Sequence, residues 1–134
     1  MQFRPALARA IIEGRKSVTR RPADVYDRRL GPAGDYERVY RAATDRLIYQ
    51  KHGSYAVQPG RGAKSVARIQ IDRIDLGYLH EMNLSDARLE GFADLDGFRR
   101  VWREMYSQWD PDTLVYVLTF RLLAPPPSGP QGAS

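Results

Sequence analysis

Alternating apolar and polar residues predict most of the β structure in this chain. The clearest strand pattern runs through the ten residues 65–74. Residues 54–58 alternate in the same way and lead into a turn at 59–62 that contains two glycines and a proline. These two segments predict a β-hairpin with a glycine-rich tip. Residues 113–122 alternate again and are predicted to form a closing strand.

Apolar residues at steps of three and four predict two amphipathic helices. The first begins at Pro5, a residue that suits the first turn of a helix, and ends at Gly14. The second is capped by Asp94. Its apolar face consists of Leu95, Phe98, Val101, Trp102, Met105, Tyr106 and Trp109. Because this spacing fills one face without a gap, we interpret these residues as part of the core instead of a surface for stacking bases.

The remaining segments carry weaker patterns. Residues 17–19 predict a short strand that ends before Pro22. Proline and glycine among charged residues predict a loop over 22–35, whereas 36–49 is compatible with two strands or a helix. Ser85 is the predicted cap of a short helix that ends at Gly91.

Together these elements predict an α+β domain, a small and mostly antiparallel curved sheet or β-barrel with flanking helices. A chain of 134 residues is expected to form one domain, which we assign to residues 1–123. Residues 124–134 are rich in proline, glycine and serine and are predicted to be a disordered tail.

Composition narrows the classes of function. The net charge of +5 comes almost entirely from arginine, which favours an anionic partner such as nucleic acid and is equally typical of a GC-rich genome. The absence of cysteine excludes disulfides, thiolate zinc sites and cysteine nucleophiles. The two histidines lie far apart, so we expect no metal site and no cofactor. With no signal peptide and no long apolar segment, we expect a cytoplasmic protein without a membrane partner.

The segment 13–21 is the strongest candidate for chemistry, because it combines a glycine, two hydroxyls and four cations. Lys16 can act as a base toward the Thr19 hydroxyl if its pKa is lowered, and Glu90 can orient the lysine or move a proton. On a regular strand Lys16 and Thr19 would face opposite sides, so Lys16 must lie in the turn after Gly14 or a bulge must intervene. A basic strand that grips phosphate, or a plain solvated strand, is also compatible with these residues.

The loop 60–65 superficially resembles a phosphate-binding loop. It lacks the first glycine at the required spacing, and a strand instead of a helix follows it, so we reject a nucleotide triphosphatase. Its backbone N–H groups, Arg61 and Lys64 remain suited to an anion, although a plain hairpin turn explains the loop equally well.

Several segments resemble the ASCH domain family of the PUA-like superfamily. Residues 12–21 resemble its glycine-arginine-lysine-threonine-x-threonine-arginine segment, with Ser17 where threonine is usual. Residues 55–62 resemble the second signature of the family. Residues 86–92, followed by Phe98, Trp102 and Tyr106, resemble the third, and 115–120 resemble its final strand. The segment 22–52 is longer than in compact members.

The resemblance implies a small β-barrel with helices around a cleft, and RNA or nucleoside ligands. Some small members are amidohydrolases that remove the acetyl group from N-acetylated cytidine with a Lys-x-x-Thr pair and a glutamate, whose positions correspond to Lys16, Thr19 and Glu90. Other members are described as RNA-binding or ribonuclease-like, so the fold leaves the activity open.

We therefore expect an amidohydrolase that acts on N4-acylated cytidine or a related modified nucleoside. The alternative is a non-catalytic module that binds single-stranded RNA, and a ribonuclease ranks below both. The residues expected to bind substrate or RNA are Arg15, Arg20, Arg21, Tyr55, Gln58, Gly60, Arg61, Gly62 and Lys64. Gly60, Arg61 and Gly62 are the expected opposite wall of the site.

Overall fold

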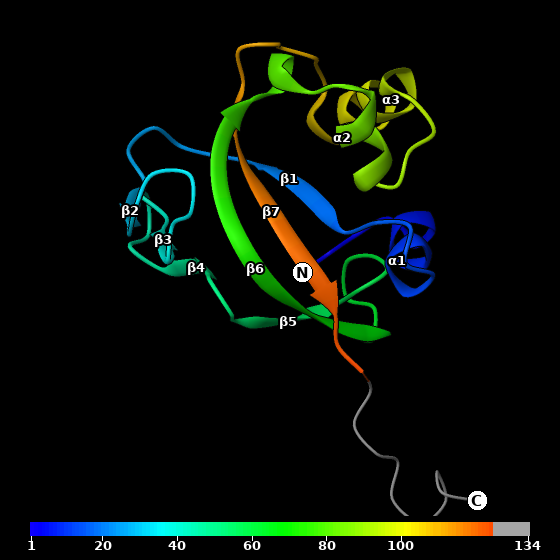
Figure 1. Cartoon of the computed structure of the whole chain (residues 1–134), viewed down its shortest axis with the longest axis horizontal. Coiled ribbons are helices and arrows are strands. Elements are labelled where there is room, and N and C mark those ends of the chain that lie inside the picture. Colours follow the sequence, from blue (N-terminus) through cyan, green and yellow to red (C-terminus); the bar gives the residue numbers. More distant parts are fainter. Residues whose placement is uncertain (125–134) are drawn as a thin grey trace, which may run out of the picture.

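A curved antiparallel sheet of four strands forms the centre of the computed structural model, which describes residues 1–124 (Figure 1). The strands are β1 (Val18–Pro22), β5 (Ser54–Val57), β6 (Ala67–Tyr78) and β7 (Leu114–Leu122), in the order β1-β7-β6-β5. The predicted hairpin and closing strand are confirmed. Most of the predicted tail lies outside the described residues.

The long strand β6 gives the sheet its curvature. It pairs with β7 along most of its length and with β5 at its beginning. The pairing with β7 shifts between Ile71 and Arg73, and such a bulge bends a strand and increases its twist. Figure 1 shows the resulting arc of β6. Ile71 and Ile74 of this strand are buried in a cluster with Val39, Tyr116 and Leu118.

A second, smaller antiparallel sheet lies beside the first. It consists of β2 (Arg28–Leu30), β3 (Arg38–Tyr40) and β4 (Leu47–Gln50) in that order. The loop predicted over 22–35 therefore contains one strand, and the ambiguous segment 36–49 contains two strands and no helix. These strands are too short to display an alternating pattern, and the burial of side chains such as Val39 against the main sheet stabilises them instead.

Strand β1 continues further than predicted, through Pro22, which pairs with Val115. A proline can end this strand because β1 lies at the edge of the sheet, so one side of its backbone needs no hydrogen-bond partner. The pairing of the chain with β7 continues beyond the proline, since Ala23 N–H donates to Leu114 O at 2.9 Å.

The three α-helices are α1 (Pro5–Ile12), α2 (Leu84–Leu89) and α3 (Leu95–Tyr106), and a short 3-10 helix covers Leu79–Glu81. Among the described residues no helix has both the length and the apolar character needed to cross a membrane. Figure 1 places α2 and α3 together at one end of β6, with α1 on the same side of the sheet.

The helix caps agree with the sequence at α3 and differ at α2. The carboxylate of Asp94 accepts a hydrogen bond from Gly97 N–H at 2.8 Å, as predicted. Helix α2 is capped by Asn83 instead of Ser85. The Asn83 side chain accepts from Asp86 N–H at 2.9 Å, and the Asp86 carboxylate accepts from Asn83 N–H at 3.0 Å. This reciprocal capping box satisfies two backbone donors and outweighs the preference of serine for a cap.

The apolar stripe of α3 packs into the core, as interpreted from the sequence. Phe98 and Trp102 form a buried cluster with Leu79, Met82 and Val115. Trp109 lies beyond the end of the helix but still contributes, because its ring contacts that of Phe98 edge-on with 6.1 Å between the centroids.

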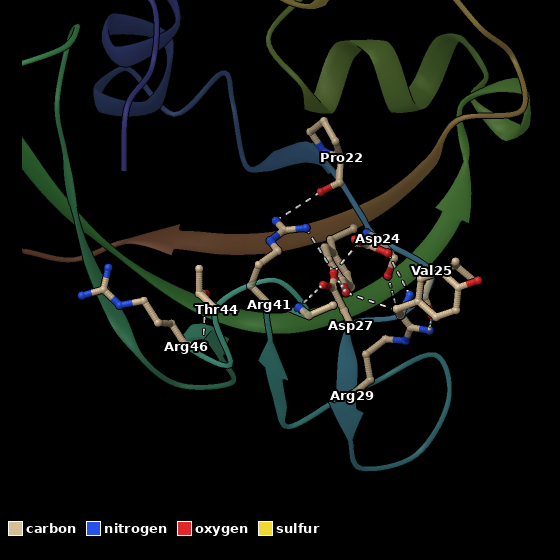
Figure 2. A network of polar contacts seen from close by, with 11 residues as sticks. Pro22, Asp24, Val25, Asp27, Arg29, Arg41, Thr44 and Arg46 are labelled. Carbon is tan, nitrogen blue, oxygen red and sulfur yellow. Dashed lines mark hydrogen bonds and ion pairs between the residues drawn. The ribbon is translucent and has the colours of Figure 1, made fainter.

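A buried polar network attaches the small sheet to the main one (Figure 2). The Asp27 carboxylate, just before β2, accepts a hydrogen bond from the Tyr116 hydroxyl of β7 at 2.7 Å. It also accepts from Ala42 N–H at 2.8 Å and from the Arg41 guanidinium at 3.2 Å. Burial raises the pKa of Asp27, but the hydrogen bonds from Tyr116, Ala42 and Asp24 outweigh that effect and hold the pKa below its ordinary value.

Candidate functional site

A small cavity lies where the edge strand β1 meets the segment before α1 and the inner face of α3. Its wall includes Lys16, Thr19 and Glu90, the three residues that the sequence grouped as candidates for chemistry. They come from the turn before β1, from β1 itself and from the end of α2. The fold therefore brings together residues that are 74 positions apart in the chain.

Lys16 lies in the turn between α1 and β1. Two backbone N–H groups, those of Arg15 and Lys16, donate to Ala10 O at 2.8 and 3.1 Å and fix this turn. Because β1 begins only at Val18, Lys16 is not bound by the alternation of a strand, and it faces the same cavity as Thr19. The position of Lys16 in the turn meets the condition under which Lys16 and Thr19 can face the same side.

The Lys16 side chain is 1% exposed and all three of its N–H groups have acceptors. Nζ donates to Val18 O at 2.7 Å, to Glu90 O at 2.9 Å and to Glu90 Oε1 at 3.2 Å. Burial lowers the pKa of the ammonium from its ordinary value. The Glu90 carboxylate opposes this shift, while the charges of Arg21 and Arg20 add to it. The result is a lysine that loses its proton more readily than a solvated one.

Glu90 is the buried acid of the site, with 2% of its surface exposed. Its second oxygen accepts a hydrogen bond from Arg20 Nη1 at 2.9 Å, so two cations share one carboxylate. Arg20 also lies 3.8 Å from a carboxylate oxygen of Asp86. A buried carboxylate without such partners would be strongly unfavourable, and the two cations offset the burial of Glu90 and fix it in place.

Gly91 allows the chain to pass directly over Lys16. Its φ of +98° lies in the region that favours glycine. A Cβ at this position would lie 3.2 Å from the Cβ of Lys16 and would press on the lysine. Gly91 therefore contributes to the placement of Lys16 as well as ending α2.

Helix α3 forms the wall opposite Thr19. Phe98, Trp102 and Tyr106 succeed each other at four-residue steps and stack along the helix, with 4.4 Å between the ring centroids of Trp102 and Tyr106. Sequence reasoning assigned these residues to the core alone, yet they border the cavity as well. Val101 and Met105 of the same helix border the cavity too, and their residue types do not distinguish them from ordinary core positions.

The segment before α1 supplies residues that the sequence analysis did not single out. Gln2, Phe3 and Arg4 all border the cavity. Arg21 reaches this segment, where its guanidinium donates to Gln2 O at 2.6 Å and lies 4.9 Å from the centre of the Phe3 ring. Nothing in the residue types of this short segment distinguishes it from an ordinary N-terminal strand.

The cavity is narrow in this structure, with about 40 Å³ open to the centres of water molecules. That space suits one or a few waters, so a nucleoside enters only if the wall moves. Arg4 and Glu104 join the two sides through an ion pair of 2.5 Å whose side chains are 41% and 48% exposed. Exposed ion pairs contribute only about 0–1 kcal/mol, so this contact opens at little cost.

Other residues expected to bind substrate or RNA do not border this cavity. The Tyr55 hydroxyl accepts a hydrogen bond from Gln50 N–H at 2.9 Å while its ring packs against the core. Gln58 donates to Ala63 O at 3.3 Å within the hairpin. Gly60, Arg61, Gly62 and Lys64 lie at or near the tip of that hairpin. Helix α3, and not this tip, is the opposite wall of the cavity.

Arg15 also lies outside the cavity, since it is exposed and pairs with Glu13 two residues before it. Within residues 1–124 no three histidine, aspartate or glutamate side chains gather closely enough to hold a metal ion.

Comparison with solved structures identifies the fold. An ASCH domain from Lactobacillus crispatus JV V101 matches with a TM-score of 0.64 and 16% identity over 87% of this chain and 69% of its own. Protein EF3133 of Enterococcus faecalis V583, of the DUF984 family, matches with a TM-score of 0.61 and 18% identity over 87% of this chain and 66% of its own.

A mutant of ZmASCH from Zymomonas mobilis matches with a TM-score of 0.51 and 16% identity over 90% of this chain and 66% of its own. This chain thus spans about two thirds of the length of the structures it matches. No protein-family model and no curated protein matches the sequence. At these identities the likeness concerns the fold, and the ASCH-type α+β fold expected from the sequence is confirmed.

Proposed function

We propose that the protein is an amidohydrolase that removes an acyl group from the exocyclic nitrogen of an N4-acylated cytidine or a related modified pyrimidine. One observation supports the proposal: the residues that line a single cavity include Thr19 as well as the buried ion pair of Lys16 and Glu90. A threonine hydroxyl becomes a useful nucleophile only when a base takes its proton, and a lysine with a lowered pKa can do so.

Proton transfer from Lys16 to Glu90 prepares the site. The two N–H groups that remain on Lys16 match the carbonyl oxygens of Val18 and Glu90, and the lone pair becomes available. The positive charge of Arg20 restrains this transfer by stabilising the Glu90 carboxylate, whereas burial of the ammonium favours it.

The acyl group is then transferred to the enzyme. Thr19 Oγ bonds to the carbonyl carbon while its proton passes to Lys16, which gives a tetrahedral intermediate. The bond between that carbon and the cytosine nitrogen breaks as Glu90 gives its proton to the nitrogen. Cytidine leaves, the acyl group remains on Thr19 as an ester, and Lys16 and Glu90 return to their ionised forms.

Water completes the cycle by the same proton path. After Lys16 again passes a proton to Glu90, water attacks the ester carbon and gives a proton to Lys16. The ester bond breaks, Glu90 protonates Thr19 Oγ, and the carboxylic acid is released. Tyr106, which borders the cavity and is only half-buried, supplies an aromatic face against which a pyrimidine ring can stack once the cavity widens.

Hydrolysis of N4-acetylcytidine by the purified chain tests this proposal. Lys16→Ala, Thr19→Ala and Glu90→Gln should each lower kcat/KM by about 100-fold or more, the typical contribution of a positioned acid or base. Thr119→Ala is a matched control, because Thr119 lies opposite Val18 on the neighbouring strand and does not border the cavity. Wild-type turnover in Thr19→Ala would refute the proposed nucleophile.

The hairpin tip favours a second candidate function, the binding of single-stranded RNA without catalysis. Arg61 and Lys64 are exposed there, and neither pairs with a carboxylate within residues 1–124. RNA binding would weaken with salt, with a log–log slope of about 0.7 per phosphate contact. A double variant, Arg61→Ala with Lys64→Ala, would reduce that slope by more than one unit. Affinity that is independent of salt would exclude this function.

A further inference from the structure

Arg21 is the one cation on the cavity wall, among the described residues, that pairs with no carboxylate. Lys16 and Arg20 share Glu90, and Arg4 pairs with Glu104. The contacts of Arg21 are the uncharged carbonyl of Gln2 and the ring of Phe3. One of its five N–H groups is used by that carbonyl, so the guanidinium is held in place while its charge is left unbalanced.

The charge of Arg21 reaches both sides of the cavity. Burial lowers the pKa of the Lys16 ammonium and raises the pKa of the Tyr106 phenol, and the positive charge of Arg21 acts downward on both. The acid on this part of the wall, Glu90, already has two cationic partners. The cavity therefore has an excess of positive charge centred on Arg21.

Arg21 is also placed to contact the same ligand as Thr19. The two residues are two positions apart on β1, so their side chains leave the strand on the same face, with about 6.6 Å between their Cα atoms. A ligand whose reacting amide lies at Thr19 presents its more distant groups toward Arg21. In a cytidine nucleotide those groups are the ribose and its phosphate.

We propose that Arg21 binds a phosphate of the substrate, so that the cavity acts on an acylated cytidine nucleotide, free or within RNA, in preference to the free nucleoside. This inference rests on the amidohydrolase function proposed above. A neutral ribose over Arg21 would displace water and offer hydroxyl oxygens as acceptors, but it brings no charge to balance the guanidinium. A phosphate replaces that water with charge-assisted hydrogen bonds, and the planar guanidinium suits two phosphate oxygens at once.

A binding experiment tests the phosphate site without requiring catalysis. Tryptophan fluorescence is suitable because Trp102 borders the cavity. Cytidine 5′-monophosphate should bind about 10- to 100-fold more tightly than cytidine, as expected for hydrogen bonds to a charged group. Arg21→Gln should remove most of this difference, whereas Arg9→Gln, on the exposed face of α1, should retain it. Equal affinity for the two compounds, or no binding of either, would overturn the inference.

Turnover separates this inference from the proposed function. The substrates are N4-acetylcytidine, its 5′-monophosphate and a short RNA that carries the same base. The proposed site predicts a higher kcat/KM for the phosphorylated substrates than for the nucleoside. The ratio of these two kcat/KM values should fall toward one in Arg21→Gln. Arg21 also influences the pKa of Lys16, and that effect changes kcat/KM for all substrates alike, so it cancels in the ratio.

The two hypotheses fail in different ways. If the nucleoside is hydrolysed as well as its phosphorylated forms, the amidohydrolase stands and the phosphate site is wrong. If no substrate is hydrolysed but cytidine 5′-monophosphate still binds through Arg21, the phosphate site stands and the amidohydrolase is wrong. A preference for the RNA over the mononucleotide identifies RNA as the source of the phosphate, and the reverse preference identifies a free nucleotide.

Discussion

Glu90 and Asp27 are both buried carboxylates that accept hydrogen bonds from arginine, yet they lie in different surroundings. The donors to Asp27 are a phenol, a guanidinium and backbone N–H groups, and it does not border the cavity beside Thr19. Glu90 borders that cavity and accepts from a buried lysine. Phenols and guanidinium groups hold their protons at neutral pH, whereas a lysine with a lowered pKa exchanges its proton more readily. A buried ion pair thus indicates chemistry only when a cavity and an exchangeable proton accompany it.

The largest expected effect on stability is that of Asp27→Ala. This change leaves the Tyr116 hydroxyl, the Arg41 guanidinium and two backbone N–H groups without their acceptor, and we expect a loss of about 3–5 kcal/mol in the free energy of unfolding. Urea denaturation measures the loss. Asp45→Asn is the control, because it removes an exposed ion pair in the turn between β3 and β4 without placing alanine at the positive φ of Asp45. A loss no greater than that of the control would show that the network around Asp27 is not structural.

Glu90→Gln should have the opposite balance of effects. The amide keeps the shape of the side chain and one oxygen acceptor, but its NH2 group replaces the second acceptor and faces Lys16 or Arg20. Because one hydrogen bond is kept, we expect a stability loss of about 1–3 kcal/mol, smaller than that of Asp27→Ala. Its effect on hydrolysis should be large, because an amide cannot carry the proton to the leaving nitrogen. Unfolding and turnover measured on the same preparation separate the two effects. If Glu90→Gln were as unstable as Asp27→Ala and kept wild-type turnover, Glu90 would be a structural residue and not part of the chemistry.

Gly91→Ala tests whether the close approach of the backbone at Gly91 positions the Lys16 side chain. The positive φ alone should destabilise the protein by about 1–2 kcal/mol. Gly62→Ala isolates this backbone effect, since Gly62 has a φ of +75° and a Cβ there would have no atom within 4 Å. The added contact at Gly91 should make Gly91→Ala the less stable variant and also lower turnover. Equal unfolding free energies and equal activities for both variants would show that Gly91 does not position the lysine.

The pH dependence of hydrolysis should be the smallest of these effects. The active pair holds one proton, which moves from Lys16 to Glu90, so activity should fall when the pair loses that proton. Because the pKa of Lys16 is lowered, this fall should begin below pH 10.5. Arg21→Gln removes a charge that lowers this pKa, so the fall should move to higher pH. A profile that does not move would contradict a base role for Lys16.

Asp27 should respond to pH through stability instead. Its pKa in the folded protein lies below the ordinary value of 3.8, so its stabilising contribution is present above that value and is lost as the pH falls through the lowered pKa. Acid titration of unfolding should show this loss in the wild-type protein and a smaller one in Asp27→Ala.

Local patterns in the sequence were sufficient for the elements with regular periodicity. The alternation on both sides of the turn at 59–62 predicted β5 and β6, and Pro5 and Asp94 marked the beginnings of α1 and α3. The small sheet was predicted only in part: two strands were one of the two alternatives for 36–49, and β2 was missed. Its three- and four-residue strands depend on burial against β7 and on the Asp27 network, which no local pattern reveals. The cap of α2 was displaced by two residues because Asn83 and Asp86 satisfy each other.

The candidate site was predictable only where its residues are close together in the sequence. Lys16 and Thr19 are close in sequence, and the glycine before them indicates a turn, so their proximity follows from local chemistry. Glu90 was grouped with them by its helix end and the family resemblance. The contributions of Arg4 and of the α3 wall depend on how two distant helices meet, and that packing could not be read from the residues themselves.

Detection of the acyl group on Thr19 tests the central claim most directly. N4-acetylcytidine would be mixed with the protein, quenched in acid during turnover and digested for mass spectrometry. We predict an added acetyl group on the peptide that contains Thr19, absent from Thr19→Ala and present in the Thr119→Ala control. Hydrolysis that continues in Thr19→Ala, or an acetyl group found only on another residue, would contradict the proposed role of the cavity.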